Sequence, residues 1–116
     1  MNSDRISLRG IEVSTRIGVP ESERAKPQRL LVDVELMHSL KPVAESDDVS
    51  KGIDYAEVVA VIQELAKTER KTVERFAEEI ADALLKNFHP KGGVKISVHK
   101  YPALPIVEAI ITIVRP

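Results

Sequence analysis

Apolar and polar residues alternate near the N-terminus, which is the pattern of a β-strand with one buried face. Ile6 and Leu8 lie on one parity, Ile11 and Val13 lie on the other, and Gly10 stands between the two pairs. A β-bulge at Gly10 would bring all four apolar side chains to the same face. The pattern therefore predicts one bulged strand rather than two short ones.

A second alternating stretch spans residues 30–36. A polar segment with two prolines, residues 18–28, separates it from the first strand. Prolines in a polar segment predict a loop. Two strands joined by a loop of this length favour an antiparallel pair.

Two helical patterns follow. Asp54 and Glu57 form a capping box, and apolar residues then recur at helical spacing as far as position 66. A second amphipathic helix begins near Thr72 and ends before Pro90. We therefore expect two helices in the middle of the chain.

The C-terminal part returns to strand patterns. Residues 94–98 alternate, and residues 107–114 form a nearly continuous β-branched run, which is typical of a strand covered on both faces. The order ββααββ predicts a single α+β domain over residues 1–116, with a four-stranded antiparallel sheet and two helices on one face. The last strand then needs another subunit to cover its second face.

Composition excludes several classes of function. The 17 Lys and Arg residues balance 18 Asp and Glu residues, and aromatic residues make up only 3%, so a nucleic-acid binder is not expected. The chain has no cysteine, which excludes disulfides, thiolate metal sites and cysteine nucleophiles. Residues 1–9 lack the apolar core of a signal peptide, and no apolar run is long enough to span a membrane. We expect a cytoplasmic protein that does not bind membranes.

Metal and phosphate motifs are not recognisable either. The three histidines, His38, His89 and His99, are scattered, so no metal site is predicted. Spacing alone leaves a Ser–His–Asp triad open, although the chain lacks a Gly-x-Ser-x-Gly motif. The paired glycines at 92–93 follow a proline and indicate a turn rather than a phosphate cradle.

Four polar residues stand where chemistry could use them. Glu23 lies in the proline-rich loop, Tyr55 and Glu74 lie in the first turns of the two helices, and Lys100 ends a strand. Each also has an ordinary structural explanation, such as a partner for the helix dipole or a solvated strand end. Taken singly, none of the four indicates a site.

Together with their neighbours, these residues resemble the dihydroneopterin aldolase family. Five segments carry the resemblance in order: Ile17-Gly18-Val19 with Glu23, Gln28-Arg29-Leu30-Leu31-Val32-Asp33-Val34, Ser46-Asp47-Asp48-Val49 leading to Ile53-Asp54-Tyr55, Val73-Glu74-Arg75-Phe76-Ala77-Glu78, and Lys100 before Pro102-Ala103. Any one of these segments is a weak signal. Their order and spacing through nearly the whole chain make a strong one.

The resemblance implies a tunnelling fold. Subunits of ββααββ topology join their sheets into a barrel-like ring, two tetrameric rings stack into a homo-octamer, and the active sites lie between neighbouring subunits. Closing the sheet across subunits also removes exposed strand edges. A small chain with a strand that is apolar on both faces agrees with such an assembly.

The implied activity is that of a lyase of folate biosynthesis. It cleaves the pterin 7,8-dihydroneopterin by a retro-aldol reaction into 6-hydroxymethyl-7,8-dihydropterin and glycolaldehyde. The C=N group of the dihydropterin ring accepts the bond electrons, so the reaction requires no metal, Schiff base or cofactor. The protein supplies positioning and proton transfers.

The resemblance also assigns roles by matched position. Glu74 resembles the pterin anchor, because a carboxylate accepts two N–H bonds from the aminopyrimidinone edge. The backbone at Val73 and Ile53 is expected to line the same pocket.

Three further positions match the catalytic residues of the family. Lys100 resembles the group that handles protons near the ring nitrogen and the side-chain hydroxyl. Tyr55 resembles the residue that passes a proton to the side-chain carbon, from the adjacent subunit. Glu23 resembles the loop carboxylate that pairs with Lys100, keeps it charged and fixes its orientation.

One segment departs from the aldolase pattern. Proline directly follows the lysine in that pattern, whereas here Tyr101 stands between Lys100 and Pro102. The following Ala103-Leu104 step is partly similar to the related epimerase of dihydroneopterin triphosphate. Epimerisation needs the same cleavage followed by reclosure, so one site could carry out both reactions, with epimerisation as a side activity, and a 2'-epimerase is the alternative enzyme. A non-catalytic, ligand-binding module of the same fold is a third possibility, although such a module does not need the four polar residues.

Overall fold

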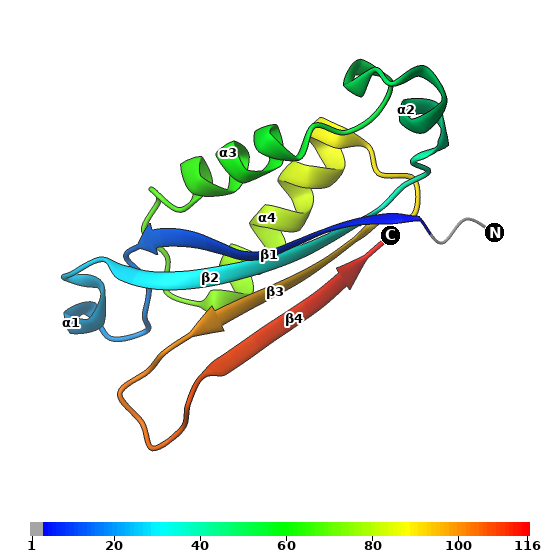
Figure 1. The fold of residues 1–116 in the computed structure, drawn as a ribbon. Helices are drawn as coiled ribbons and strands as arrows, with labels where there is room; N and C mark the ends of the chain where they lie inside the picture. Colours follow the sequence, from blue (N-terminus) through cyan, green and yellow to red (C-terminus); the bar gives the residue numbers. More distant parts are fainter. Residues whose placement is uncertain (1–3) are drawn as a thin grey trace.

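The structure, a computed structural model that describes residues 4–116, builds a four-stranded sheet with two long helices across one face (Figure 1). Its elements in chain order are β1 (Arg5–Thr15), α1 (Glu21–Arg24), β2 (Gln28–Met37), α2 (Lys41–Ser46), the 3₁₀ turn η1 (Val49–Lys51), α3 (Tyr55–Leu65), α4 (Val73–Phe88), β3 (Val94–Lys100) and β4 (Ala109–Arg115). The strands pair antiparallel in the order β1-β2-β3-β4. The predicted α+β fold and ββααββ order are confirmed.

A bulge at Gly10 lets β1 bury one face along its whole length. The pairing of β1 with β2 shifts register between Leu8 and Ile11, and Gly10 has a φ of 72°. Ile11 and Val13 are buried, and Ile6 and Leu8 pack against the same core. The predicted bulge is confirmed, and glycine suits it because a positive φ costs other residues more.

The core lies between the sheet and the apolar faces of α3 and α4. Asp54 begins α3 by accepting the Ala56 N–H at 3.0 Å, and Thr72 begins α4 by accepting the Arg75 N–H at 3.2 Å. The fully buried side chains come from both layers: Val58, Ile62, Phe76, Ile80, Leu84, Leu30, Val32, Val34, Leu36, Val94, Ile96 and Val98. Both helix starts therefore follow from side-chain caps that the sequence indicates.

Two boundaries differ from the sequence-based prediction. The segment 18–28, predicted as a loop, contains the one-turn helix α1, which follows Pro20, and β2 already begins at its last residue. The last strand begins at Ala109 rather than at 107, because Val107 belongs to the preceding turn and is 89% exposed. The short elements α2 and η1 were not predicted at all.

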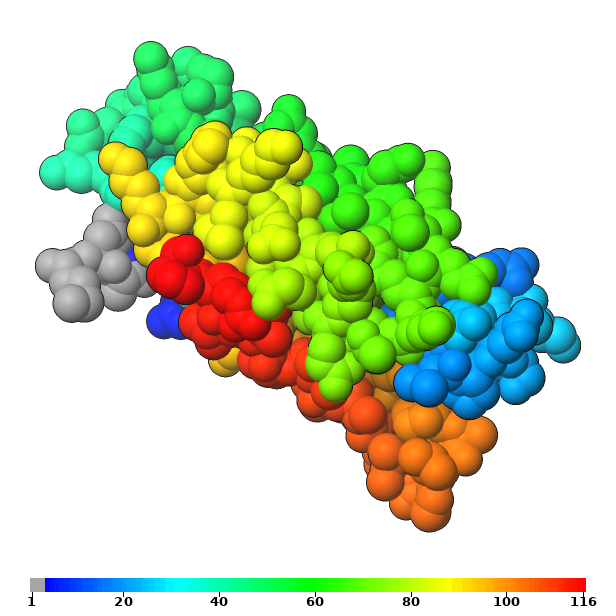
Figure 2. Space-filling view, turned by 180° about the vertical axis from the view of Figure 1, so that it is seen from behind, coloured from blue at the N-terminus to red at the C-terminus, as the bar shows by residue number. Residues whose placement is uncertain are grey.

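Helices cover one face of the sheet and leave the other face open. Figure 2 shows α3 and α4 over the sheet, with the orange turn before β4 projecting past one end. Ile110 and Val114 of β4 are 49% and 60% exposed, so in a single chain this strand has one open apolar side. None of the helices in residues 4–116 combines the length and the apolar character that a membrane span requires.

Candidate active site

Lys100 and Glu23 form an ion pair at one end of the sheet. Lys100 Nζ lies 2.8 Å from Glu23 Oε2, and the two side chains are only 15% and 32% exposed. Lys100 is the last residue of β3 and pairs with Ala109 of β4. The Tyr101 that follows it therefore leaves Lys100 within the regular pairing of the hairpin.

The surroundings of Glu23 keep its carboxylate charged. The hydrogen bond from Lys100 lowers the pKa of Glu23, and this effect together with a bond from Gln28 outweighs the opposing effect of burial. Gln28 Nε2 lies 3.3 Å from Glu23 Oε2 and also donates to the Ile17 carbonyl at 2.7 Å. Sequence reasoning quoted Gln28 in a segment of the family resemblance but assigned it no role in the site.

Gly18 provides the space that Glu23 occupies. A Cβ on Gly18 would overlap the Glu23 side chain, and its φ of 150° also disfavours other residues. The Gly18 N–H donates to the Arg70 carbonyl at 3.2 Å. The loop after β1 is therefore fixed against the segment that leads into α4.

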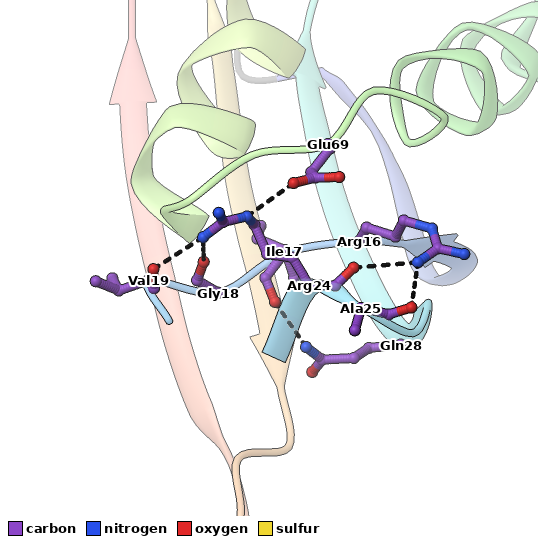
Figure 3. A network of polar contacts seen from close by, with 8 residues as sticks. All are labelled: Arg16, Ile17, Gly18, Val19, Arg24, Ala25, Gln28 and Glu69. Carbon is purple, nitrogen blue, oxygen red and sulfur yellow. Dashed lines mark hydrogen bonds and ion pairs between the residues drawn. The ribbon is translucent and has the colours of Figure 1, made fainter. Parts of the chain in front are cut away.

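A network of arginines holds the loop that carries Glu23 (Figure 3). Arg24 turns its guanidinium inward and donates to the carbonyls of Gly18 and Val19, both at 2.8 Å. Its Nε also binds the Glu69 carboxylate at 2.8 Å. Arg16 donates to the carbonyls at the end of α1, at residues 24 and 25. Together with Gln28, these arginines supply side-chain donors to five backbone carbonyls of the loop, at residues 17, 18, 19, 24 and 25, which gives it a defined shape.

A buried arginine organises the start of α4. The Arg70 guanidinium donates to the carbonyls of Leu65 and Thr68, each at 2.8 Å, and binds the Glu79 carboxylate. It also lies over the Phe76 ring, with Cζ 4.9 Å from the centroid. These contacts tie the end of α3 to the first turns of α4.

Glu74 lies at the same end of the molecule as Lys100. It is exposed on the first turn of α4, whose preceding segment contacts Gly18. Within residues 4–116 its carboxylate has no hydrogen bond or ion pair, which leaves it open to a ligand. Val73, directly before it, is buried with 8% exposure.

Tyr55 and Ile53 lie at the opposite end. Tyr55 begins α3, and the far end of this helix is the one that Arg70 ties to the loop after β1. Ten helical steps separate the two ends by about 15 Å. In Figure 1 the first turn of α3 lies beside α2, far from α1, in a chain that extends 51 Å along its longest axis. A single chain therefore does not bring Tyr55 to Lys100.

The residues around Tyr55 form an open apolar groove of about 500 Å³. Its lining includes Ile53, Leu40, Val43 and Val49, and Tyr55 itself is 60% exposed at its rim. The sequence-predicted site residues thus fall into two groups: Glu23, Glu74, Val73 and Lys100 at one end, and Ile53 and Tyr55 at the other. Among residues 4–116, no group of three or more His, Asp or Glu side chains is placed to hold a metal ion.

Comparisons with known proteins match nearly the whole chain to one family. A family model described as dihydroneopterin aldolase matches residues 6–114. The chain is 35% identical to a dihydroneopterin aldolase of Streptomyces coelicolor, with 97% of each chain covered, and 35% identical to one of Haemophilus influenzae, with 87% and 86% covered. The crystal structure of the Escherichia coli dihydroneopterin aldolase in complex with neopterin superposes with a TM-score of 0.89 at 28% identity, covering 97% of this chain and 99% of that one. The chain therefore belongs to the dihydroneopterin aldolase family and has its tunnelling fold.

Proposed function

We propose that the protein is a cytoplasmic aldehyde-lyase of folate biosynthesis that cleaves 7,8-dihydroneopterin into 6-hydroxymethyl-7,8-dihydropterin and glycolaldehyde. The observation that carries this proposal is the Lys100–Glu23 ion pair, at 2.8 Å, at the end of the sheet where Glu74 has an unpaired carboxylate. A fixed ammonium and a free carboxylate at the same end of the molecule suit a heteroaromatic ring that needs both an anchor and a proton donor.

Glu74 is the anchor for the pterin in this proposal. A carboxylate on the first turn of a helix accepts two parallel N–H bonds from the aminopyrimidinone edge of the ring. The first turn of α4 also presents free backbone N–H groups to polar atoms of the same ligand. The backbone at Val73 is expected to contribute to this pocket, and that at Ile53 to approach it from a neighbouring subunit.

The cleavage balances without an added electron acceptor. A base takes the proton of the side-chain hydroxyl, and the carbon–carbon bond next to it breaks to release glycolaldehyde. The electron pair of that bond moves into the C=N group of the ring, whose nitrogen takes up a proton and becomes an enamine nitrogen. Protonation of the side-chain carbon, with loss of the proton from that nitrogen, then restores the C=N bond and gives the product.

The proton transfers are assigned to two side chains. Lys100 acts near the ring nitrogen and the reacting hydroxyl, where its ammonium stabilises the negative charge that develops. Glu23 holds Lys100 in place through their ion pair. Tyr55 passes the proton to the side-chain carbon.

The proposal requires at least two copies of the chain. Tyr55 and Lys100 lie at opposite ends of one chain, so a neighbouring subunit has to supply the tyrosine to each site. The outer edges of β1 and β4 have no strand partner within residues 4–116, and β4 also presents Ile110 and Val114 to its open side. Closing such edges by pairing with other copies gives a ring, and two tetrameric rings form the expected octamer.

Product analysis tests the activity. The full chain is incubated with 7,8-dihydroneopterin and, separately, with its triphosphate, and the products are separated chromatographically. Release of glycolaldehyde from 7,8-dihydroneopterin supports the aldolase. Formation of only the 2'-epimer from the triphosphate would make the protein the epimerase instead. No conversion of either compound would leave a ligand-binding module.

A further inference from the structure

The open face of the sheet carries a polar cluster that the proposed reaction does not use. His99 stands directly before Lys100 in β3, and because side chains alternate along a strand it points to the face without helices. His99 Nε2 lies 2.7 Å from Asp33 Oδ2, and His99 Nδ1 lies 3.1 Å from Glu108 Oε2. Both ring nitrogens are therefore bound by carboxylates, and the imidazole is only 18% exposed.

The cluster links three strands and the turn between β3 and β4. Asp33 Oδ1 accepts the N–H of Gly10 in the bulge of β1 at 2.7 Å, while its other oxygen binds His99. Glu108 ends the hairpin turn, which we define as residues 101–108. Among the described residues, Glu108 is the only member of the hairpin turn whose side chain has a hydrogen bond to the rest of the chain.

We propose that His99 is a positioning residue for Lys100, because its imidazolium holds the hairpin turn that begins directly after that lysine. The side chain of Lys100 is held by Glu23, and its backbone pairs with Ala109, so Lys100 and Ala109 form the last paired position before the hairpin turn. Loosening the turn lets this last pair open and so frees the backbone of Lys100 to move. The proposal rests on the proposed function, since it concerns how that lysine meets its substrate.

The protonation state of His99 decides whether its hydrogen bonds with Asp33 and Glu108 both form. A protonated imidazole donates from both nitrogens, whereas a neutral one places an acceptor against one of the two carboxylates and loses that link. Burial lowers the pKa of His99, but the hydrogen bonds with Asp33 and Glu108 outweigh it and raise the pKa above 6.5. Arg9 and Tyr101 line the same hollow as His99, and the charge of Arg9 lowers the pKa of Asp33. Both links are therefore formed while the imidazole is protonated, and one of them is lost as the pH rises through the pKa of His99.

Three variants of the full-length protein separate this role from simple stability. His99→Gln removes the titrating group, and Glu108→Gln keeps a hydrogen-bond acceptor but removes one charge. His89→Asn is the matched control, because His89 caps α4 in a left-handed conformation that asparagine tolerates. For each variant, kcat and KM for 7,8-dihydroneopterin are measured across pH. The titration of His99 is followed by NMR, and amide exchange is followed in the hairpin turn.

In the wild type we expect kcat to fall with rising pH through the same pKa that NMR assigns to His99. His99→Gln lowers kcat about tenfold at pH values below the pKa that NMR assigns to His99, as expected when a catalytic group is misplaced. The same variant leaves KM within about twofold, loses the alkaline limb and speeds amide exchange in the hairpin turn. Glu108→Gln moves the alkaline fall of kcat and the NMR titration of His99 to lower pH together. His89→Asn changes none of these quantities.

Unchanged pH profiles and turn exchange in His99→Gln, with normal cleavage by the wild type, would overturn the positioning role. Failure of the proposed function looks different. In that case the wild type does not cleave dihydroneopterin, yet the exchange of the hairpin turn still follows the titration of His99.

Discussion

The carboxylate of Glu23 lies directly against Gly18, in the space that the Cβ of any other residue would fill. Two residues five positions apart thus depend on each other, since only glycine lets this acid reach Lys100 from the loop. The relationship gives the Ile17-Gly18-Val19 segment a physical role in the site.

Gly18→Ala should therefore damage activity more than stability. We expect kcat to fall at least about tenfold as the Glu23–Lys100 pair is displaced, with about 1–3 kcal/mol of destabilisation from crowding and backbone strain. Gly10→Ala is the control, because Gly10 also has a positive φ but no atom within 4 Å of an added Cβ. Steady-state kinetics and urea unfolding compare the two. Equal loss of activity in both variants would contradict the special contact at Gly18.

Lys100→Met should abolish cleavage while pterin binding persists. The side chain keeps its length and apolar stem, so the site retains its shape and loses only the ammonium. We expect kcat to fall about 10²–10⁴-fold, the usual contribution of a general acid–base group. Neopterin binding by calorimetry should change little. Turnover near the wild-type rate would remove Lys100 from the mechanism.

Glu74→Ala should act on pterin binding, unlike Lys100→Met, which acts on cleavage. Truncating the anchor is expected to weaken pterin binding by about 2–5 kcal/mol, the range for losing one partner of a buried charged hydrogen bond. Calorimetry with neopterin measures this directly. Glu64→Ala, at an exposed site on α3 away from the proposed pocket, serves as the control and should bind normally. Equal affinities of the two variants would argue against Glu74 as the anchor.

Mixing inactive variants tests whether the site is shared between subunits. Tyr55→Ala and Lys100→Met are each expected to lose activity. After unfolding together at equal amounts and refolding, about a quarter of the sites between copies should combine an intact tyrosine with an intact lysine. The recovered activity should be proportional to this fraction of intact sites. No recovery from well-folded mixed oligomers would place both residues in the site of one chain, against the separation seen here.

Acid should remove the contribution of the Glu23–Lys100 pair to stability. The pKa of Glu23 is lowered below 4.5 in the folded chain, so the stabilisation is present above that value and is lost as the pH falls through the folded pKa. Near neutral pH, Lys100→Met should cost about 1 kcal/mol relative to the wild type, since the pair is partly exposed. Well below pH 4.5 the difference should disappear.

The control for this measurement is Lys95→Met. Lys95 lies 3.8 Å from Glu35 and its side chain is 47% exposed, so the variant should change stability little at either pH. Urea unfolding is compared at one protein concentration, because assembly contributes to the measured free energy. A cost of Lys100→Met that is the same at both pH values would show that packing, rather than charge, is responsible.

Periodicity and capping predicted much of the fold. The alternating stretches, the parity change at Gly10 and the caps at Asp54 and Thr72 are local signals, and the structure uses each of them. The capping box is only half formed, because within residues 4–116 the Glu57 side chain makes no return bond. The helix α1 was missed because one turn is too short to show a period.

The site was predictable only through resemblance. No local pattern indicates that Glu23 reaches Lys100, because the contact joins residues 77 positions apart in the chain and depends on the loop being folded by Arg16, Arg24 and Gln28. The His99 cluster is equally invisible in the sequence. It requires the register of β2 and β3, which sets Asp33 diagonally across from the histidine.

The bulge in β1 also decides where this strand can lose a residue. From Leu8 to Ile11 the strand advances three positions while β2 advances two, from Val34 to Val32, so deleting one of the two residues between them would restore regular pairing and leave Ile6 and Leu8 on the core face. Deleting a residue in the regular part of the strand would instead turn every side chain on one side of the deletion to the opposite face. The bulge is thus the one place in β1 where a shorter strand keeps the same buried face.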